Sequence, residues 1–89
     1  MKFTFTETKE IELEIDFQKI YDFIKKEYEN DQDYDPDPWD IHNDFGDNMD
    51  YYLKKIYGYI IEDNDSNDLA MDLVFNEWGD WIRDNKIDK

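Results

Sequence analysis

Hydrophobic and polar residues alternate in two short segments at the start of the chain. Phenylalanines alternate with threonines in residues 2–6, and aliphatic residues alternate with glutamates in residues 10–15. A period of two is typical of strands that bury one face. The pattern therefore predicts a β-hairpin that turns near residues 7–9.

The hydrophobic spacing then changes to that of helices. From Asp16, a candidate N-cap, hydrophobic residues recur at intervals of three and four, so we expect the first helix to end near Asn30. The two prolines of residues 31–38 predict a loop. Pro38 is suited to the first turn of a short helix, which we expect Gly46 to end.

Two further helices are predicted in the second half of the chain. The first of these is capped at Asp47 or Asn48 and contains Gly58, which we expect to permit close packing because glycine inside a helix is otherwise unfavourable. The polar residues 62–68 predict a turn, and the last helix runs through about Asn85. The predicted fold class is α+β, with an N-terminal hairpin followed by three main helices and one short helix.

The composition supports one small folded domain spanning residues 1–89. Phe, Tyr and Trp make up 18% of the residues, which supplies a core despite a net charge of −15. The chain has no cysteine, so packing alone must hold the fold together. We see no export signal and no run of apolar residues long enough to cross a membrane, so we expect a cytoplasmic protein without a membrane partner.

The acidic residues are segregated along the chain. No lysine or arginine occurs between Lys26 and Lys54, or from Ile56 to Ile82. Interspersed charges would serve solubility equally well, so this segregation suggests a binding surface. The candidate partner-binding residues form two runs: Asp31, Asp33, Asp35, Asp37, Asp40, Asp44, Asp47 and Asp50, and then Asp63, Asp65, Asp68 and Asp72.

The last predicted helix shows the same feature in its geometry. On the side away from its aromatic stripe, acidic or amide residues recur at every fourth position: Asp68, Asp72, Asn76, Asp80 and Asp84. Like charges at this spacing destabilise a helix by about 0.2–0.5 kcal/mol per pair. Leu69 and Leu73 project among these residues, so we expect the acidic face to include an apolar component.

Metal binding and catalysis find little support in the sequence. Calcium loops that begin at Asp31 or Asp63 would have Pro36 or Asp68 at the position that requires glycine, so no specific metal site is expected. With one histidine and no cysteine, the common nucleophilic constellations cannot form. We expect His42 to be a half-buried core residue, and we predict a protein that is not an enzyme and holds no cofactor.

The strong acidity also argues against direct nucleic-acid binding, which needs basic residues. The small size, the absence of cysteine, the segregated acidity and the aromatic core resemble the small acidic DNA-mimic inhibitors of phages and other mobile elements, including anti-CRISPR and anti-restriction proteins. No motif is shared with that class. The resemblance implies a stoichiometric inhibitor that occupies the basic DNA-binding cleft of a host defence nuclease, such as a CRISPR effector or a restriction enzyme.

Two alternatives remain open. The chain could be an acidic interaction or adaptor module that binds one basic partner without imitating DNA. A solvated surface of the halophile type is the third interpretation, and it predicts unfolding at low salt through self-repulsion. Abundant lysine makes the third interpretation less attractive.

Overall fold

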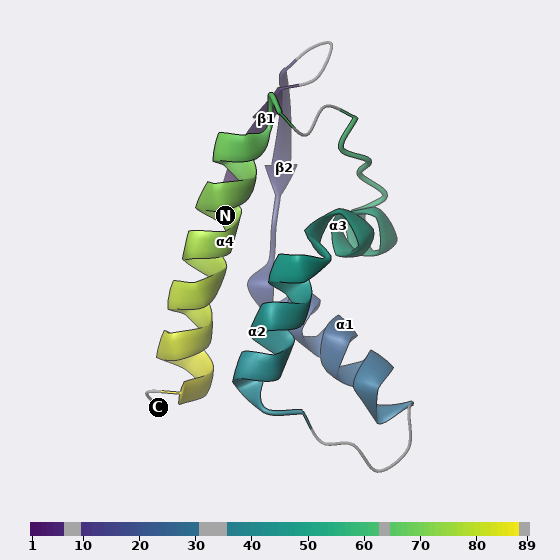
Figure 1. Ribbon diagram of the computed structural model, residues 1–89, viewed down its shortest axis with the longest axis vertical. Coiled ribbons are helices and arrows are strands. Elements are labelled where there is room, and N and C mark those ends of the chain that lie inside the picture. The colour runs from purple at the N-terminus through teal and green to yellow at the C-terminus, as the bar shows by residue number, and fades with distance from the viewer. Residues whose placement is uncertain (7–9, 31–35, 63–64, 88–89) are drawn as a thin grey trace.

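A two-stranded hairpin and four α-helices form the computed structural model, which describes residues 1–6, 10–30, 36–62 and 65–87 (Figure 1). The predicted α+β class and hairpin are confirmed, although the expected turn at residues 7–9 lies outside the described residues. The elements in chain order are β1 (Lys2–Thr6), β2 (Glu10–Glu14), α1 (Phe17–Glu29), α2 (Pro38–Asp47), α3 (Met49–Tyr57), α4 (Asp68–Ile82) and the π-helical segment η1 (Arg83–Ile87).

The hairpin turns its hydrophobic face toward the helices. β1 and β2 are antiparallel, with Phe3 opposite Leu13 and Phe5 opposite Ile11. Phe3 and Phe5 are almost completely buried, whereas the residues between them are exposed, as the period of two predicted. α4 runs alongside the hairpin (Figure 1), and it covers this face together with residues from α1.

Trp78 of α4 lies at the centre of the core. Its side chain is fully buried and contacts the rings of Phe17 and Phe45, with ring centroids 5.6 and 5.0 Å apart. The indole N–H donates a hydrogen bond to the backbone oxygen of His42 at 3.1 Å, which satisfies the polar end of a buried ring. His42 itself is half-buried between the rings of Trp39 and Phe75, in agreement with the sequence prediction.

The starts of α1 and α2 agree with the predictions. The Asp16 side chain caps α1 by accepting a hydrogen bond from the Gln18 amide at 3.0 Å. Pro38 is the first residue of α2. The last helix also agrees in extent, since α4 ends at Ile82 and continues directly into η1.

The roles predicted for Gly46 and Gly58 were wrong and are exchanged in the structure. Gly46 lies inside α2, where a methyl group would collide with the Phe75 ring, so it permits the close approach of α2 and α4. Gly58 follows the last residue of α3 in the left-handed conformation, with φ of 68°, and a methyl group there would meet nothing within 4 Å. Gly58 therefore ends a helix that we expected to continue through it.

The start of α4 is tied to the end of β1 by a buried side chain. Asn67 is fully buried, and its Oδ1 accepts a hydrogen bond from the Thr6 amide at 2.6 Å. This contact joins residues 61 positions apart in sequence. None of the described helices combines the length and the hydrophobicity needed to cross a bilayer.

Candidate interaction surface

Eight of the twelve predicted partner-binding aspartates lie in the described part of the chain. Asp31, Asp33, Asp35 and Asp63 lie outside it. The described members are Asp37, Asp40, Asp44, Asp47 and Asp50 of the first run, and Asp65, Asp68 and Asp72 of the second. All are exposed except Asp44, which is half-buried.

Asp37 and Asp40 form a capping box at the start of α2. The Asp37 carboxylate accepts a hydrogen bond from the Trp39 amide at 2.9 Å, and the Asp40 carboxylate accepts one from the Asp37 amide at 3.2 Å. Each carboxylate thus satisfies a backbone donor that the helix leaves unpaired. We did not predict this structural role from the sequence, although the order Asp, Pro, Trp, Asp at residues 37–40 indicates it.

Asp44 is also engaged within the fold. Its Oδ2 accepts a hydrogen bond from the Tyr52 hydroxyl at 2.7 Å, and its Oδ1 accepts one from Asn48 Nδ2 at 2.9 Å. Asn48 precedes α3, but its side chain bonds back to Asp44 instead of capping α3. Burial, followed by the hydrogen bond from its hydroxyl to Asp44, raises the pKa of Tyr52.

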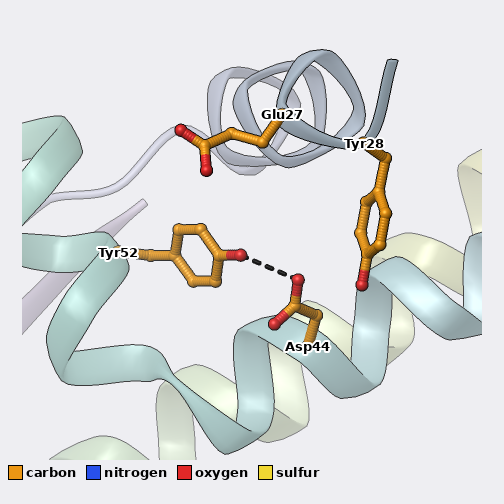
Figure 2. A pocket seen from close by; sticks show the side chains of 4 residues that line it. All are labelled: Glu27, Tyr28, Asp44 and Tyr52. Atoms are coloured by element: carbon orange, nitrogen blue, oxygen red, sulfur yellow. Dashed lines mark hydrogen bonds between the residues drawn. The ribbon is translucent and has the colours of Figure 1, made fainter. Parts of the chain in front are cut away.

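A small hollow opens beside this hydrogen bond. Glu27 and Tyr28 of α1, Asp44 of α2 and Tyr52 of α3 line it, and Figure 2 shows the four side chains around a common space. Its volume is about 200 Å³. Two carboxylates and two phenol groups offer hydrogen-bond acceptors to an amine or a guanidinium group. This hollow could not be predicted from the sequence, because three different helices bring its residues together.

The two acidic runs meet where α2 passes into α3 beside α4. Asp47 lies with Asp68 and Asp72 around one hollow of about 310 Å³. An adjoining hollow of about 270 Å³ has Asp47 and Asp50 in its wall. The sequence had left open whether the runs share a face, and the structure shows that these four carboxylates do.

Both hollows also contain apolar side chains, which we call the apolar floor of the groove. Met49 and Met71 line both hollows, and Phe75 lines the larger one. We call Asp47, Asp50, Asp68 and Asp72, with Met49 and Met71 between them, the acidic groove. The sequence does not predict that these methionines line a groove. Both belong to hydrophobic stripes, and such stripes predict core positions.

Leu69 and Leu73 do not supply this apolar floor. Their side chains are 84% and 52% exposed and line a separate hollow between α4 and β1. Both leucines are exposed on the side of α4 away from Trp78, as expected, but they are not part of the acidic groove, whose apolar side chains come from another side of α4. Asp65 is exposed in the turn before α4 and does not line either hollow of the acidic groove.

Few cations neutralise the described carboxylates. The ion pairs that join described residues are those of the terminal amine with Glu14 and of Arg83 with Asp80, both at exposed positions. Three lysines lie over aromatic rings instead: Lys19 over Tyr57, Lys55 over Tyr51, and Lys86 over Tyr21 and Trp81. Among the described residues, no lysine or arginine lines the acidic groove.

Within residues 1–6, 10–30, 36–62 and 65–87, no three histidine, aspartate or glutamate side chains are placed so that they could hold one metal ion. Comparison of the chain with protein families, with curated proteins and with solved structures found no match.

Proposed function

We propose that this protein is a stoichiometric, non-enzymatic inhibitor that imitates DNA and occupies the DNA-binding cleft of a host defence nuclease, either a CRISPR effector or a restriction enzyme. It acts in the cytoplasm of the cell that contains the nuclease. The observation that carries the proposal is the acidic groove, in which carboxylates from two separate runs converge and no lysine or arginine of the described residues forms part of the lining.

The charge and the dimensions support this proposal. Duplex DNA carries one negative charge per about 1.7 Å of its axis, so the net charge of −15 corresponds to about 25 Å of duplex. The longest dimension of the protein is 43 Å. A domain of this size can therefore present a phosphate-like density of charge to a cleft built for a short stretch of duplex.

The side chains of the groove suit the residues that bind DNA. Arginine pairs with carboxylates as it does with phosphates, through two parallel hydrogen bonds. The methylene stem of such an arginine needs an apolar surface, and Met71 lies between the carboxylates of the groove to provide one. In the hollow beside Tyr52, the Glu27 carboxylate offers a second position for one basic side chain.

The second candidate function is an acidic interaction module that does not imitate DNA. The apolar floor of the groove favours it, because Met49, Met71 and Phe75 have no counterpart in a phosphate backbone. A partner that combines basic and apolar side chains would use this floor fully. Both candidates predict a basic partner, and they differ in whether DNA competes with the protein.

Competition with duplex DNA separates the two candidates. The protein is immobilised, bacterial lysate is passed over it, and the bound proteins are eluted first with duplex DNA and then with salt. The DNA-mimic proposal predicts that a nuclease or another DNA-binding protein elutes with the duplex. A partner that stays bound through excess duplex and leaves only in salt would contradict the proposal and support the interaction module.

A further inference from the structure

A row of exposed apolar side chains continues from the acidic groove along the seam between α2 and α4. Trp39 and Phe75 are 40% and 36% exposed, and exposed aromatic rings that lie together mark interaction sites. His42 lies between them, with its ring centroid 5.1 Å from that of Trp39 and 4.8 Å from that of Phe75. Phe75 also lines the larger hollow of the groove together with Met71. We call Trp39, His42, Phe75 and Met71 the apolar ridge.

The charge around the apolar ridge selects the kind of partner that can cover it. Neither α2 nor α4 contains a lysine or an arginine, and the first cation after α4, Arg83, is paired with Asp80. Carboxylates of the acidic groove stand beside Met71 at one end of the ridge. A second copy of this chain, with its net charge of −15, would be repelled. The complementary partner therefore combines apolar side chains with basic ones.

The length of the apolar ridge matches one face of a short helix. Trp39, His42 and Gly46 are at positions i, i+3 and i+7 of α2, which span about 10 Å along its axis. A partner helix presents apolar anchors at i, i+3 or i+4, and i+7 over the same length. The hollow at Gly46, of about 310 Å³, has room for one such anchor beside Met71.

We propose that the apolar ridge and the acidic groove together bind one basic amphipathic helix of the partner. The apolar side chains of that helix pack along the ridge, one of them in the hollow beside Met71, and its arginines or lysines pair with the carboxylates of the groove. This inference rests on the proposed function, since both place a basic partner at the groove. It goes further because part of the affinity comes from apolar contacts, which salt does not screen.

Two synthetic peptides of equal charge test this inference on the full chain. Both peptides are helical and carry the same arginines, but one has leucine at the three anchor positions and the other has glutamine there. Titration calorimetry should show that the leucine peptide binds at least about tenfold more tightly, because glutamine buries less apolar surface. The ratio of the two affinities should persist at high salt, although both affinities fall as the charges are screened.

Variants of the protein that keep its net charge locate the binding site of the leucine peptide. Trp39→Gln and Met71→Gln should each weaken the leucine peptide by about tenfold and leave the glutamine peptide almost unchanged. Ile60→Gln is the matched control, because Ile60 is 57% exposed and lies outside the apolar ridge. This control should bind both peptides as the parent does. Circular dichroism confirms that each variant is folded.

Nuclear magnetic resonance locates the peptide on the parent protein, without any substitution. Addition of the leucine peptide should shift the Met71 methyl and the Trp39 indole N–H signals and leave the Ile60 methyl signals in place. Equal affinities of the two peptides, or shifts that avoid Met71 and Trp39, would overturn the inference. These probes include neither a nuclease nor DNA, so the inference can fail while DNA competition supports the proposed function. A partner that resists duplex DNA would contradict the proposed function and leave the peptide result standing.

Discussion

The Tyr52 hydroxyl donates a hydrogen bond of 2.7 Å to Asp44, and this contact joins α3 to α2 beneath the acidic surface. Most of the Tyr52 side chain is buried, and its hydroxyl lies at the wall of the hollow with Asp44 as its acceptor. Asp44 belongs to the first acidic run by sequence, yet its carboxylate is committed to Tyr52 and Asn48. One run of aspartates therefore contains both structural carboxylates and carboxylates that are available to a partner.

Removing the Asp44 carboxylate should destabilise the fold. Asp44→Ala removes the charged acceptor of the Tyr52 hydroxyl, and a hydrogen bond to a charged group contributes about 1.5–3 kcal/mol. Asp50→Ala is the matched control, because Asp50 is exposed and accepts none of the hydrogen bonds found between described side chains. Denaturant unfolding followed by tryptophan fluorescence measures both. Equal stability of the two variants would show that the contact contributes nothing.

The unfolding free energy should depend on pH in the alkaline range. Burial raises the pKa of both Tyr52 and Tyr57, and for Tyr52 the hydrogen bond to Asp44 adds to the effect. The folded state then keeps protons that the unfolded state releases, so stability is full below about pH 10 and falls above it. Each such tyrosine adds a slope of about 1.4 kcal/mol per pH unit.

Tyr52→Phe tests this assignment, since phenylalanine has no proton to release. The variant should lose part of the alkaline slope and keep the part that comes from Tyr57. Urea unfolding at a series of pH values from neutral to alkaline measures the slope. A slope that is identical in the variant and the parent would contradict the role of Tyr52.

The glycines should respond differently to alanine. Gly46→Ala gains about 1 kcal/mol of helix propensity but forces a methyl group into the Phe75 ring, and overpacking costs about 1–3 kcal/mol, so we expect net destabilisation. Adding Phe75→Ala should make Gly46→Ala favourable. Gly58→Ala should lose about 1–2 kcal/mol because of its positive φ. Thermal unfolding of the single and double variants decides between these outcomes.

Gly79 provides the comparison within α4. A methyl group there would lie 3.3 Å from His42 Nε2, the end of a side chain that can move slightly. Gly79→Ala should therefore be neutral or stabilising. Gly46→Ala should lower the melting temperature and Gly79→Ala should not. Equal changes in the two variants would show that the contact with Phe75 does not require glycine at position 46.

The elements of the fold were predictable because each follows from a local signal. The period of two in β1 and β2, the cap at Asp16 and the proline at the start of α2 all appear within a few neighbouring residues. The role of Gly46 was predicted wrongly because it depends on another helix. The Phe75 ring of α4 occupies the space that a side chain at Gly46 of α2 would need. Phe75 lies 29 positions after Gly46, so the local pattern contains no trace of their contact.

The candidate site was predictable in composition and not in geometry. The basic-free runs pointed to Asp47, Asp50, Asp68 and Asp72, but their convergence depends on how α4 packs against α2. Tertiary contacts also decide which carboxylates form hydrogen bonds within the fold. Asp44 does so because Tyr52 and Asn48 lie beside it. Leu69 and Leu73 shared a helical face with aspartates by spacing, and only the position of β1 assigns them to another surface.

Under the proposed function, the carboxylates of the acidic groove bind the partner, and the overall charge alone does not suffice. Two variants with equal net charge separate these explanations. In one, Asp47, Asp50, Asp68 and Asp72 are changed to Asn. In the other, Glu10, Glu12, Asp22 and Glu29 are changed to Gln or Asn. Each set of four changes raises the net charge from −15 to −11.

The decisive measurement is the affinity of both variants for the partner that duplex DNA displaces, by calorimetry, with circular dichroism confirming that both are folded. We expect the groove variant to bind at least about a hundredfold more weakly than the parent, because several charge-assisted hydrogen bonds are lost, while the matched variant binds nearly as well. Equal losses in the two variants, or a groove variant that binds as tightly as the parent, would show that the groove is not the binding site.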